Sequence, residues 1–305
     1  MEHMRKLLFV VNAHAGKAAI RTQLVRILDT FVRSGWLPTV YISQRSGELP
    51  AMVAREAHRY DMVVCSGGDG TLNETLNGLM TMDHPPMLGY IPAGTTNDFA
   101  ASLGLSKVMA KAAETAVEGV PVSLDVGRFG SRYFAYVAAF GAFTDVTYAT
   151  PQQAKNSLGR LAYLLEGAQR LSSLKTYPLQ VEYDDGVTEG EFLVGLVSNS
   201  NYVAGLPVGK WIDTSMRDGL LEVTLVRKPS HATQLGRVAS SLLQGELDPE
   251  LVFSVKTRRL RITSPEAIPW TLDGEYGGAC AVADIEARPR ALTIRIPQET
   301  LLPKA

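Results

Sequence analysis

Strand-length apolar runs alternate with helical patterns over roughly the first 120 residues of the chain. The predicted strands are Leu7–Asn12, Thr39–Ser43, Asp61–Cys65 and Met87–Ile91. The predicted helices lie between them, at Ile20–Phe31, Leu49–Arg59 and Leu72–Met82, and a fourth is capped by Ser106 and ends before Gly119. Strands separated by helices pair in parallel through right-handed crossovers, so this half is expected to be an α/β domain.

From about Val122 onward, strand patterns dominate. Two hairpins are expected, one joining Val122–Phe129 to Arg132–Phe140 and one joining Leu179–Tyr183 to Val187–Leu196. The second hairpin contains Asp185-Gly186, a dipeptide typical of type I′ turns. Further strands are predicted at Leu220–Val226, Val252–Val255, Arg258–Ile262, Ala281–Ile285 and Ala291–Ile296, and helices at Gly159–Leu171 and His231–Leu243. Many short strands joined by turns favour an antiparallel sandwich.

Composition narrows the function classes. The chain has 305 residues, 46% of them hydrophobic, which excludes an intrinsically disordered protein. Its 30 basic and 31 acidic residues argue against a nucleic-acid binder that works by bulk charge. Two cysteines fit a reducing cytoplasm, and no apolar run reaches the roughly 20 residues of a membrane span, so we expect a soluble cytoplasmic protein.

The segment from Ser66 to Glu74 carries the strongest chemical signal, because it lies between a predicted buried strand and a helix. Three glycines in four positions let the backbone approach a ligand, and the amides at a helix N-terminus favour phosphate. Asp69 would repel phosphate unless it binds a metal or directs a proton. The alternative is a plain glycine turn with a capping aspartate.

Two common nucleotide motifs do not match. Asn73 stands where the third glycine of a dinucleotide fingerprint belongs. Gly16-Lys17 is followed by Ala18, which lacks the hydroxyl of a P-loop, and Val11 replaces its first glycine. A dehydrogenase and a P-loop enzyme are therefore both disfavoured.

Polar, glycine-containing loops follow three of the predicted strands, at Asn12–Lys17, Ser66–Thr71 and Gly94–Asp98. Ligands of open α/β sheets bind at the carboxyl ends of the strands. Any one of these loops alone would fit an ordinary helix start, but their joint occurrence predicts a single nucleotide site.

The segments Gly67–Glu74, Pro92–Phe99 and Leu272–Gly278 together resemble the diacylglycerol kinase family, above all its soluble bacterial members. The first element alone is shared with NAD kinases and phosphofructokinase-like enzymes. The combination is more specific, and the resemblance covers about residues 5 to 297.

The resemblance implies a three-layer αβα ATP-binding domain, residues 1–123 with 297–305, and a mostly antiparallel β-sandwich lipid domain, residues 124–296. It also implies transfer of the ATP γ-phosphoryl group to diacylglycerol, with Mg²⁺, transient contact with a membrane surface, no nucleic acid, and a homodimer. Another lipid alcohol, such as a sphingoid base, or NAD stays open as the acceptor, as does a regulator without catalysis.

The resemblance also implies the nucleotide contacts. They are Asn12, Ala13, His14, Ala15, Gly16, Lys17, Ser43, Ser66, Gly67, Gly68, Asp69, Gly70, Thr71, Leu72, Thr95 and Asn97. Ala13 and Ala15 replace the family's usual proline and serine. Asp69 and Asp98 are expected to anchor magnesium together with the nucleotide. Asp125 could join them, although we slightly favour a structural role for it.

The base that accepts the hydroxyl proton is expected in Asp273-Gly274-Glu275. On a strand the two carboxylates would share a face, but Gly274 makes a turn equally possible. Spacing alone favours two solvated carboxylates; the resemblance makes Glu275 the base and Asp273 its orienting or metal-linked partner.

A structural magnesium is implied at Asp218, with the main-chain carbonyls of Ser215 and Leu220. The alternative is an Asp-Gly turn that leads into a strand. The basic residues Lys256, Arg258, Arg259 and Arg261 could attract anionic lipid headgroups. We favour a solvated strand edge for this basic run.

Overall fold

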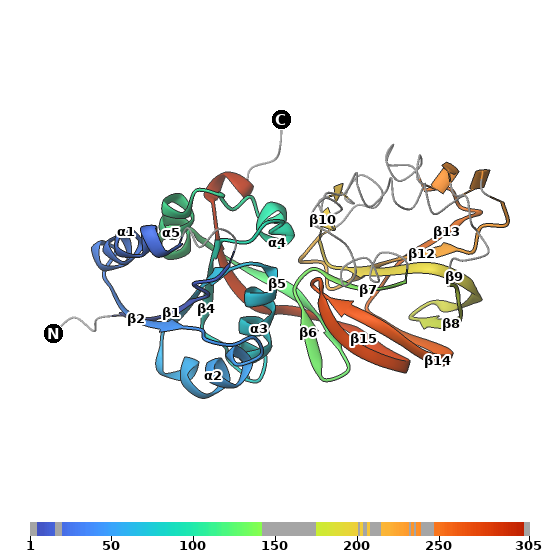
Figure 1. The fold of residues 1–305 in the computed structure, drawn as a ribbon, viewed down its shortest axis with the longest axis horizontal. Helices are drawn as coiled ribbons and strands as arrows, with labels where there is room; N and C mark the ends of the chain where they lie inside the picture. Colours follow the sequence, from blue (N-terminus) through green and yellow to red (C-terminus); the bar gives the residue numbers. More distant parts are fainter. Residues whose placement is uncertain are drawn as a thin grey trace. The chain divides into compact units, whose positions relative to one another are not determined.

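The structure is a computed structural model (Figure 1). It describes residues 5–15, 20–141, 175–200, 202–203, 206–207, 215–231, 233–234, 236–238 and 247–301. The predicted helix Gly159–Leu171 and most of His231–Leu243 lie outside these residues. None of the described helices is both long and apolar enough to cross a bilayer.

The chain forms two compact units. The first contains Met1–Leu124 and Arg290–Ala305, and the second Asp125–Pro289. The chain passes from one unit to the other within two strands, β5 (Val120–Phe129) and β15 (Glu275–Ile296). The sequence-based domain boundaries were placed after residues 123 and 296.

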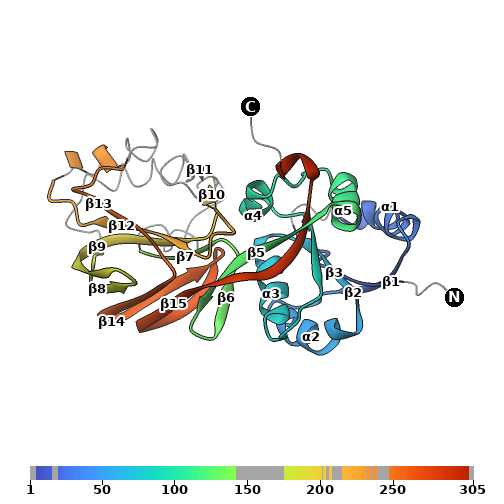
Figure 2. The same cartoon turned by 180° about the vertical axis from the view of Figure 1, so that it is seen from behind.

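The first unit is built on a parallel sheet. Its strands are β1 (Arg5–Val11), β2 (Trp36–Ile42), β3 (Met62–Gly67), β4 (Met87–Pro92) and the last part of β15, in the order β15-β4-β3-β1-β2. Strand β5 pairs with β15, and the two run side by side in both views (Figures 1 and 2).

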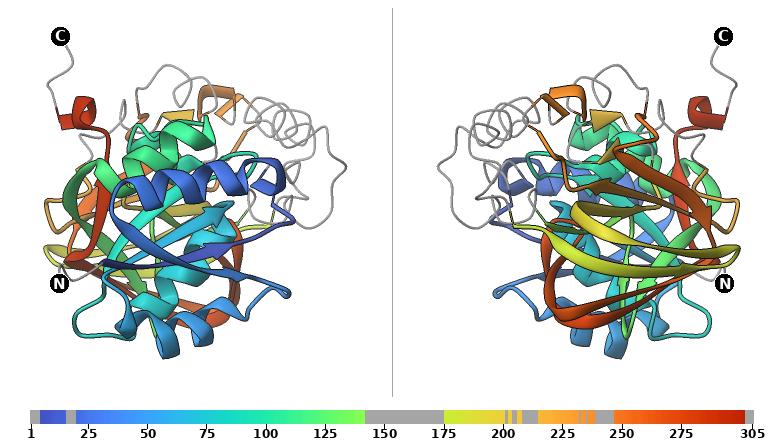
Figure 3. Two further views of the ribbon diagram at one scale, coloured as in Figure 1. Left: turned by 90° about the vertical axis from the view of Figure 1, so that its left-hand side faces the viewer. Right: turned by 90° about the vertical axis from the view of Figure 1, so that its right-hand side faces the viewer.

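Helices cover both faces of this sheet. Helices α1 (Ile20–Arg33) and α5 (Met109–Glu118) contact each other on one face, and α2 (Leu49–Glu56) and α3 (Asp69–Leu79) contact each other on the opposite face (Figures 1 and 3). Phe9 of β1 packs against Phe31 of α1, with ring centroids 5.2 Å apart, while the next residue, Val10, is also fully buried. Burial of both faces explains the continuous apolar runs and confirms the three-layer αβα fold.

The second unit is antiparallel. Its main strands are β6 (Arg132–Phe134), β7 (Val137–Gly141), β8 (Tyr177–Tyr183), β9 (Gly186–Ser198), β12 (Leu221–Arg227), β13 (Val252–Thr257), β14 (Arg259–Leu272) and β15. They follow the order β13-β12-β9-β7-β14-β15, and β8 pairs with both β9 and β14. The fully buried Trp270 packs against Phe140 and Phe129, at centroid distances of 4.9 and 5.0 Å.

Small elements complete the two units. The 3₁₀ segments η1 (Ala57–Arg59) and η5 (Gln298–Leu301) and the short helix α4 (Asp98–Ser102) belong to the first unit. The two-residue strands β10 (Tyr202–Val203) and β11 (Leu206–Pro207) pair with each other in the second.

The predicted strand Arg132–Phe140 is wrong, because it divides into β6 and β7. Strand β6 pairs with β5, whereas β7 pairs with β9 and β14. The backbone amides of Ala135, Tyr136 and Val137, at the break, donate to the carboxylate of Asp273 instead of to a neighbouring strand.

The type I′ turn predicted at Asp185-Gly186 is also wrong. Tyr183 pairs with Gly186, so Asp184 and Asp185 form the loop, and neither has a positive φ. Asp184 is held by the next strands: its N–H donates to Thr257 Oγ1 (3.1 Å), and its Oδ2 accepts from the N–H of Arg258 (2.6 Å). Ala281–Ile285 and Ala291–Ile296, expected as two strands, belong to the single strand β15.

Candidate functional site

The three polar loops lie together at the carboxyl edge of the parallel sheet, as predicted. Asn12 connects the first two, because its Nδ2 donates to Thr71 Oγ1 (3.0 Å) and its N–H to the carbonyl of Ser66 (2.9 Å). The N–H of Ala93 donates to the carbonyl of Gly67 (2.8 Å), which joins the second loop to the third. One continuous polar rim results.

Glycine is required where the second and third loops meet. A Cβ on Gly94 would lie 2.6 Å from the Cα of Gly68, and one on Gly67 would lie 2.4 Å from the side chain of Thr71. The two backbones therefore touch directly, and helix α3 begins at Asp69, immediately after the contact. Exposed backbone amides at the start of a helix suit a phosphate group.

Asn97 connects the third loop to Asp69. Its backbone is left-handed (φ 53°), and its N–H donates to Asp69 Oδ2 (2.9 Å). Its side-chain amide accepts from the N–H of Gly94 (3.0 Å) and donates to the carbonyl of the same residue (2.8 Å). Asp98 follows as the buried first residue of α4, so the two carboxylates expected near magnesium flank one ordered turn.

The remaining residues predicted to contact the nucleotide differ in how exposed they are. Ser43 is beside the first loop, where its N–H donates to the carbonyl of Val11 (2.9 Å). His14 and Thr95 are exposed. Ala13, Ala15 and Gly70 are half-buried, and Ser66 and Leu72 are buried. Gly16 and Lys17 lie outside the described residues.

Two residues that support the loops were missed from the sequence. Glu74 accepts hydrogen bonds from the N–H of Gly47 (2.7 Å) and the hydroxyl of Ser46 (3.3 Å), so it holds the segment before α2. Tyr90 donates to the carbonyl of Gly67 (3.2 Å) from within β4. Glu74 could have been suspected from its place in the glycine motif, but a tyrosine in an apolar strand looks like core.

The Asp273-Gly274 pair forms the tight turn between β14 and β15. Leu272 pairs with Glu275, and the φ angles of 52° and 83° at Asp273 and Gly274 are those of a type I′ turn. Asp273 is buried, and its carboxylate accepts from the N–H groups of Ala135 (2.7 Å), Tyr136 (3.0 Å) and Val137 (3.1 Å). This environment makes Asp273 an anchor for the turn.

Glu275 has a different environment from Asp273. It is the first residue of β15, its side chain is exposed, and it forms no hydrogen bond or ion pair with the described residues. The two carboxylates therefore do not share a strand face. Of the two side chains, that of Glu275 is the exposed one.

Replacing Asp273 with alanine is expected to destabilise the fold. Three buried amides would lose their acceptor, so we expect a fall of about 3–5 kcal/mol in the free energy of unfolding, measured by urea denaturation. Asp284→Ala is the matched control. That carboxylate pairs with Arg261 on the surface, so its removal should lower the free energy of unfolding by about 1 kcal/mol or less. Equal losses in the two variants would contradict the anchoring role.

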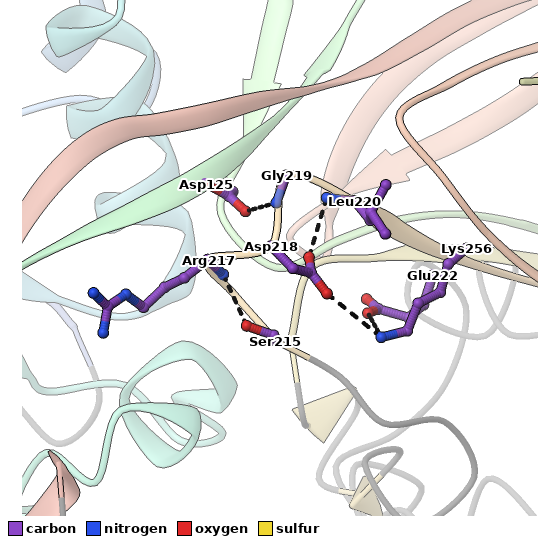
Figure 4. A network of polar contacts seen from close by, with 8 residues as sticks. All are labelled: Asp125, Ser215, Arg217, Asp218, Gly219, Leu220, Glu222 and Lys256. Atoms are coloured by element: carbon purple, nitrogen blue, oxygen red, sulfur yellow. Dashed lines mark hydrogen bonds and ion pairs between the residues drawn. The ribbon is translucent and has the colours of Figure 1, made fainter.

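Asp218 belongs to a charged network in the second unit (Figure 4). Its Oδ1 accepts from the N–H of Leu220 (3.1 Å), and its Oδ2 lies 3.4 Å from the Nζ of Lys256. Lys256 Nζ also lies 3.9 Å from Oε1 of the buried Glu222. The carboxyl groups of Asp218 and Glu222 therefore approach the same ammonium group.

Asp125 belongs to the second unit, where it forms hydrogen bonds with the backbone and with a neighbouring side chain. Its Oδ2 accepts from the N–H of Gly219 (2.6 Å; Figure 4), and its own N–H donates to the carbonyl of Met216 (2.8 Å). The buried amide of Asn199 donates to its carbonyl (2.7 Å). These contacts support the structural role that we favoured over a nucleotide-linked one.

The basic run pairs with acidic neighbours. Arg261 contacts Asp284 through two bonds (2.6 and 3.0 Å), Arg259 Nε lies 3.9 Å from Asp184, and Lys256 pairs with Asp218. Because these cations already face carboxylates, the contacts favour a solvated strand edge over an anion-binding surface.

Both parts of the chain are similar to known proteins. The family model for the diacylglycerol kinase catalytic domain matches residues 6–129, and the model for the YegS C-terminal NAD kinase beta sandwich-like domain matches residues 138–296. A diacylglycerol kinase from Bacillus subtilis is 34% identical over 278 residues, which are 90% of this chain and 91% of that protein. The chain belongs to the diacylglycerol kinase family.

Other similar proteins support the same family and fold. A diacylglycerol kinase from Staphylococcus carnosus is 34% identical over 280 residues, 90% of each chain. One solved structure from Bacillus anthracis has a TM-score of 0.84 at 24% identity, covering 99% of this chain and 98% of that one, which supports the fold. In terms of the two family models, the three loops lie in the catalytic domain, and Asp218, Asp273 and Glu275 lie in the sandwich-like domain.

The oxygen donors around Asp218 are of the type that a magnesium ion prefers. Magnesium prefers oxygen ligands from one or two carboxylates and keeps several waters. Asp218 provides a carboxylate, and the carbonyls of Ser215 and Leu220 are in the same segment. Among the described residues, no three acidic, histidine or cysteine side chains cluster as a metal site, so main-chain oxygens would be needed.

Proposed function

We propose that this chain is an ATP-dependent lipid kinase that phosphorylates diacylglycerol to phosphatidic acid. The observation that carries the proposal is the polar rim, in which Asn12, Gly67 and Gly94 bring three loops together and Asn97 holds Asp69 by its backbone N–H. The names of the relatives, diacylglycerol kinases over nine-tenths of the chain, supply the acceptor.

In the proposed reaction, the free hydroxyl oxygen of diacylglycerol attacks the γ-phosphorus of ATP. The bond from that phosphorus to the bridging oxygen breaks, and ADP leaves. Glu275 accepts the hydroxyl proton, and the backbone amides at the start of α3 bind phosphate oxygens. Asp69 and Asp98 would hold magnesium with the nucleotide, where its charge neutralises the phosphates.

The acceptor is tested with labelled ATP and a panel of diacylglycerol in mixed micelles, sphingosine and NAD. We expect labelled phosphatidic acid and little label in the other two products. If the protein binds ATP but labels only sphingosine or NAD, the proposed acceptor is wrong and the labelled compound replaces it. A protein that labels none of the three would contradict the proposal and favour a regulator without catalysis.

We also propose that Asp218, with the carbonyls of Ser215 and Leu220, binds a structural magnesium. Without nucleotide, millimolar MgCl₂ is expected to raise the melting temperature of the protein by a few degrees. A ligand at about a hundred times its Kd stabilises the folded state by about 2.7 kcal/mol. Asp218→Ala should abolish this shift, whereas Asp284→Asn should keep it. A full shift in Asp218→Ala, or none in the unmodified protein, would exclude the site.

Because diacylglycerol is a membrane lipid, the proposal includes transient contact with a membrane surface. Homodimer formation stays a prediction from the family resemblance.

A further inference from the structure

Tyr90 lies directly beneath the two glycine loops. It is fully buried in β4 and pairs across the sheet with Cys65 of β3. Its hydroxyl donates to the carbonyl of Gly67 (3.2 Å) and is 3.4 Å from Oδ1 of Asn97. These two acceptors belong to different loops, so a single side chain bridges them.

The hydroxyl of Tyr90 keeps its proton. Burial, followed by the nearby charge of Asp69, raises the pKa of Tyr90 well above its usual value of 10.0. A protonated hydroxyl is a donor, and both of its neighbours here are acceptors. The hydroxyl is therefore available as a donor to either loop.

The contact reaches Asp69 through Asn97. Oδ1 of Asn97 accepts from the N–H of Gly94 and from Tyr90, which fixes the amide and supports the left-handed backbone. That backbone directs the N–H of Asn97 toward Asp69 Oδ2 (2.9 Å). Without the Tyr90 hydroxyl, only the hydrogen bonds to Gly94 would orient the side-chain amide of Asn97.

We propose that Tyr90 is a positioning residue for the nucleotide: it fixes the spacing of the loops at Gly67 and Gly94 and, through Asn97, the carboxylate of Asp69. The inference rests on the proposed function of these loops as the ATP site. Because Tyr90 is buried and, among the described residues, contacts only the proposed ATP loops through its hydroxyl, we expect its loss to affect ATP more than the lipid.

Tyr90→Phe removes only the hydroxyl. We expect the KM for ATP and the Kd of a fluorescent ATP analogue to rise about three- to tenfold, the value of one hydrogen bond. The KM for diacylglycerol should stay within about twofold of the unmodified protein, because the lipid makes no use of this contact. Tyr183→Phe is the matched control. That tyrosine packs against Phe253 in the second unit, and its variant should leave both constants unchanged.

A double-mutant cycle tests the route through Asn97. Asn97→Gly removes the amide but tolerates the positive φ. If Tyr90 acts through Asn97, adding Tyr90→Phe to Asn97→Gly should raise the Kd much less than Tyr90→Phe does alone. Additive effects, an unchanged Kd in Tyr90→Phe, or an equal rise in both KM values would overturn the inference. Because the Kd needs no turnover, the inference can fail or hold whatever the acceptor panel shows.

Discussion

Asp69→Asn is expected to lower kcat by on the order of a thousandfold while the protein stays folded. An asparagine can still accept the hydrogen bond from the N–H of Asn97, so the turn before α4 is preserved. The negative charge that would hold magnesium beside the phosphates is lost, and a preorganised electrostatic contact of this kind is worth about 10²–10³ in rate. The measurements are labelled phosphatidic acid formed per second and the melting temperature.

A second variant separates charge from position. Asp69→Ala also removes the acceptor of the Asn97 N–H, so it should weaken ATP binding in addition to the loss of kcat. Asp29→Asn is the control, since Asp29 is on α1 and pairs with Arg33 on the surface. If Asp69→Asn retains more than a tenth of the unmodified kcat, the proposed role of Asp69 is wrong.

The layers of the first unit could be predicted because its elements depend on local patterns. Val10 and its neighbours in β1 are buried on both faces, which leaves a continuous apolar run that a sequence displays directly. The three loops then follow from the rule that ligands meet the carboxyl ends of parallel strands. The hydrogen bonds of Asn12 and Asn97 confirm that these loops come together.

The second unit depends on contacts that a sequence pattern does not show. Asp185-Gly186 and Asp273-Gly274 are the same dipeptide, yet only the second occupies a type I′ turn. The register of the β8–β9 hairpin is set in part by Thr257 and Arg258, which bind Asp184 from more than 70 residues away. No local propensity contains that information.

The different environments of Asp273 and Glu275 also depend on residues far away in the sequence. The break between β6 and β7 occurs where three backbone amides bind Asp273, whose partner Tyr136 is 137 residues away in the sequence. From spacing alone, Asp273 and Glu275 were equivalent carboxylates. In the structure Asp273 is buried and accepts three amide hydrogen bonds, whereas Glu275 is exposed.

Glu275→Gln is accordingly expected to lower kcat by about 10²–10⁴, the usual contribution of a general base. The KM for ATP should change little, since Glu275 is a separate residue from the nucleotide loops and the amide is isosteric with the acid. The measurement is a steady-state titration of each substrate with labelled ATP. A loss confined to kcat indicates a group that acts in the transition state.

Glu286→Gln is the matched control for this prediction. Glu286 is on the same strand, β15, but its carboxylate pairs with Arg128 (3.0 Å) and Arg288 (3.3 Å). The control should turn over at the unmodified rate, because that carboxylate contributes only a surface ion pair. If Glu275→Gln stays within about threefold of the unmodified kcat, Glu275 is not the base. Asp273 is buried and already accepts three amide hydrogen bonds, so we expect it not to take over this role.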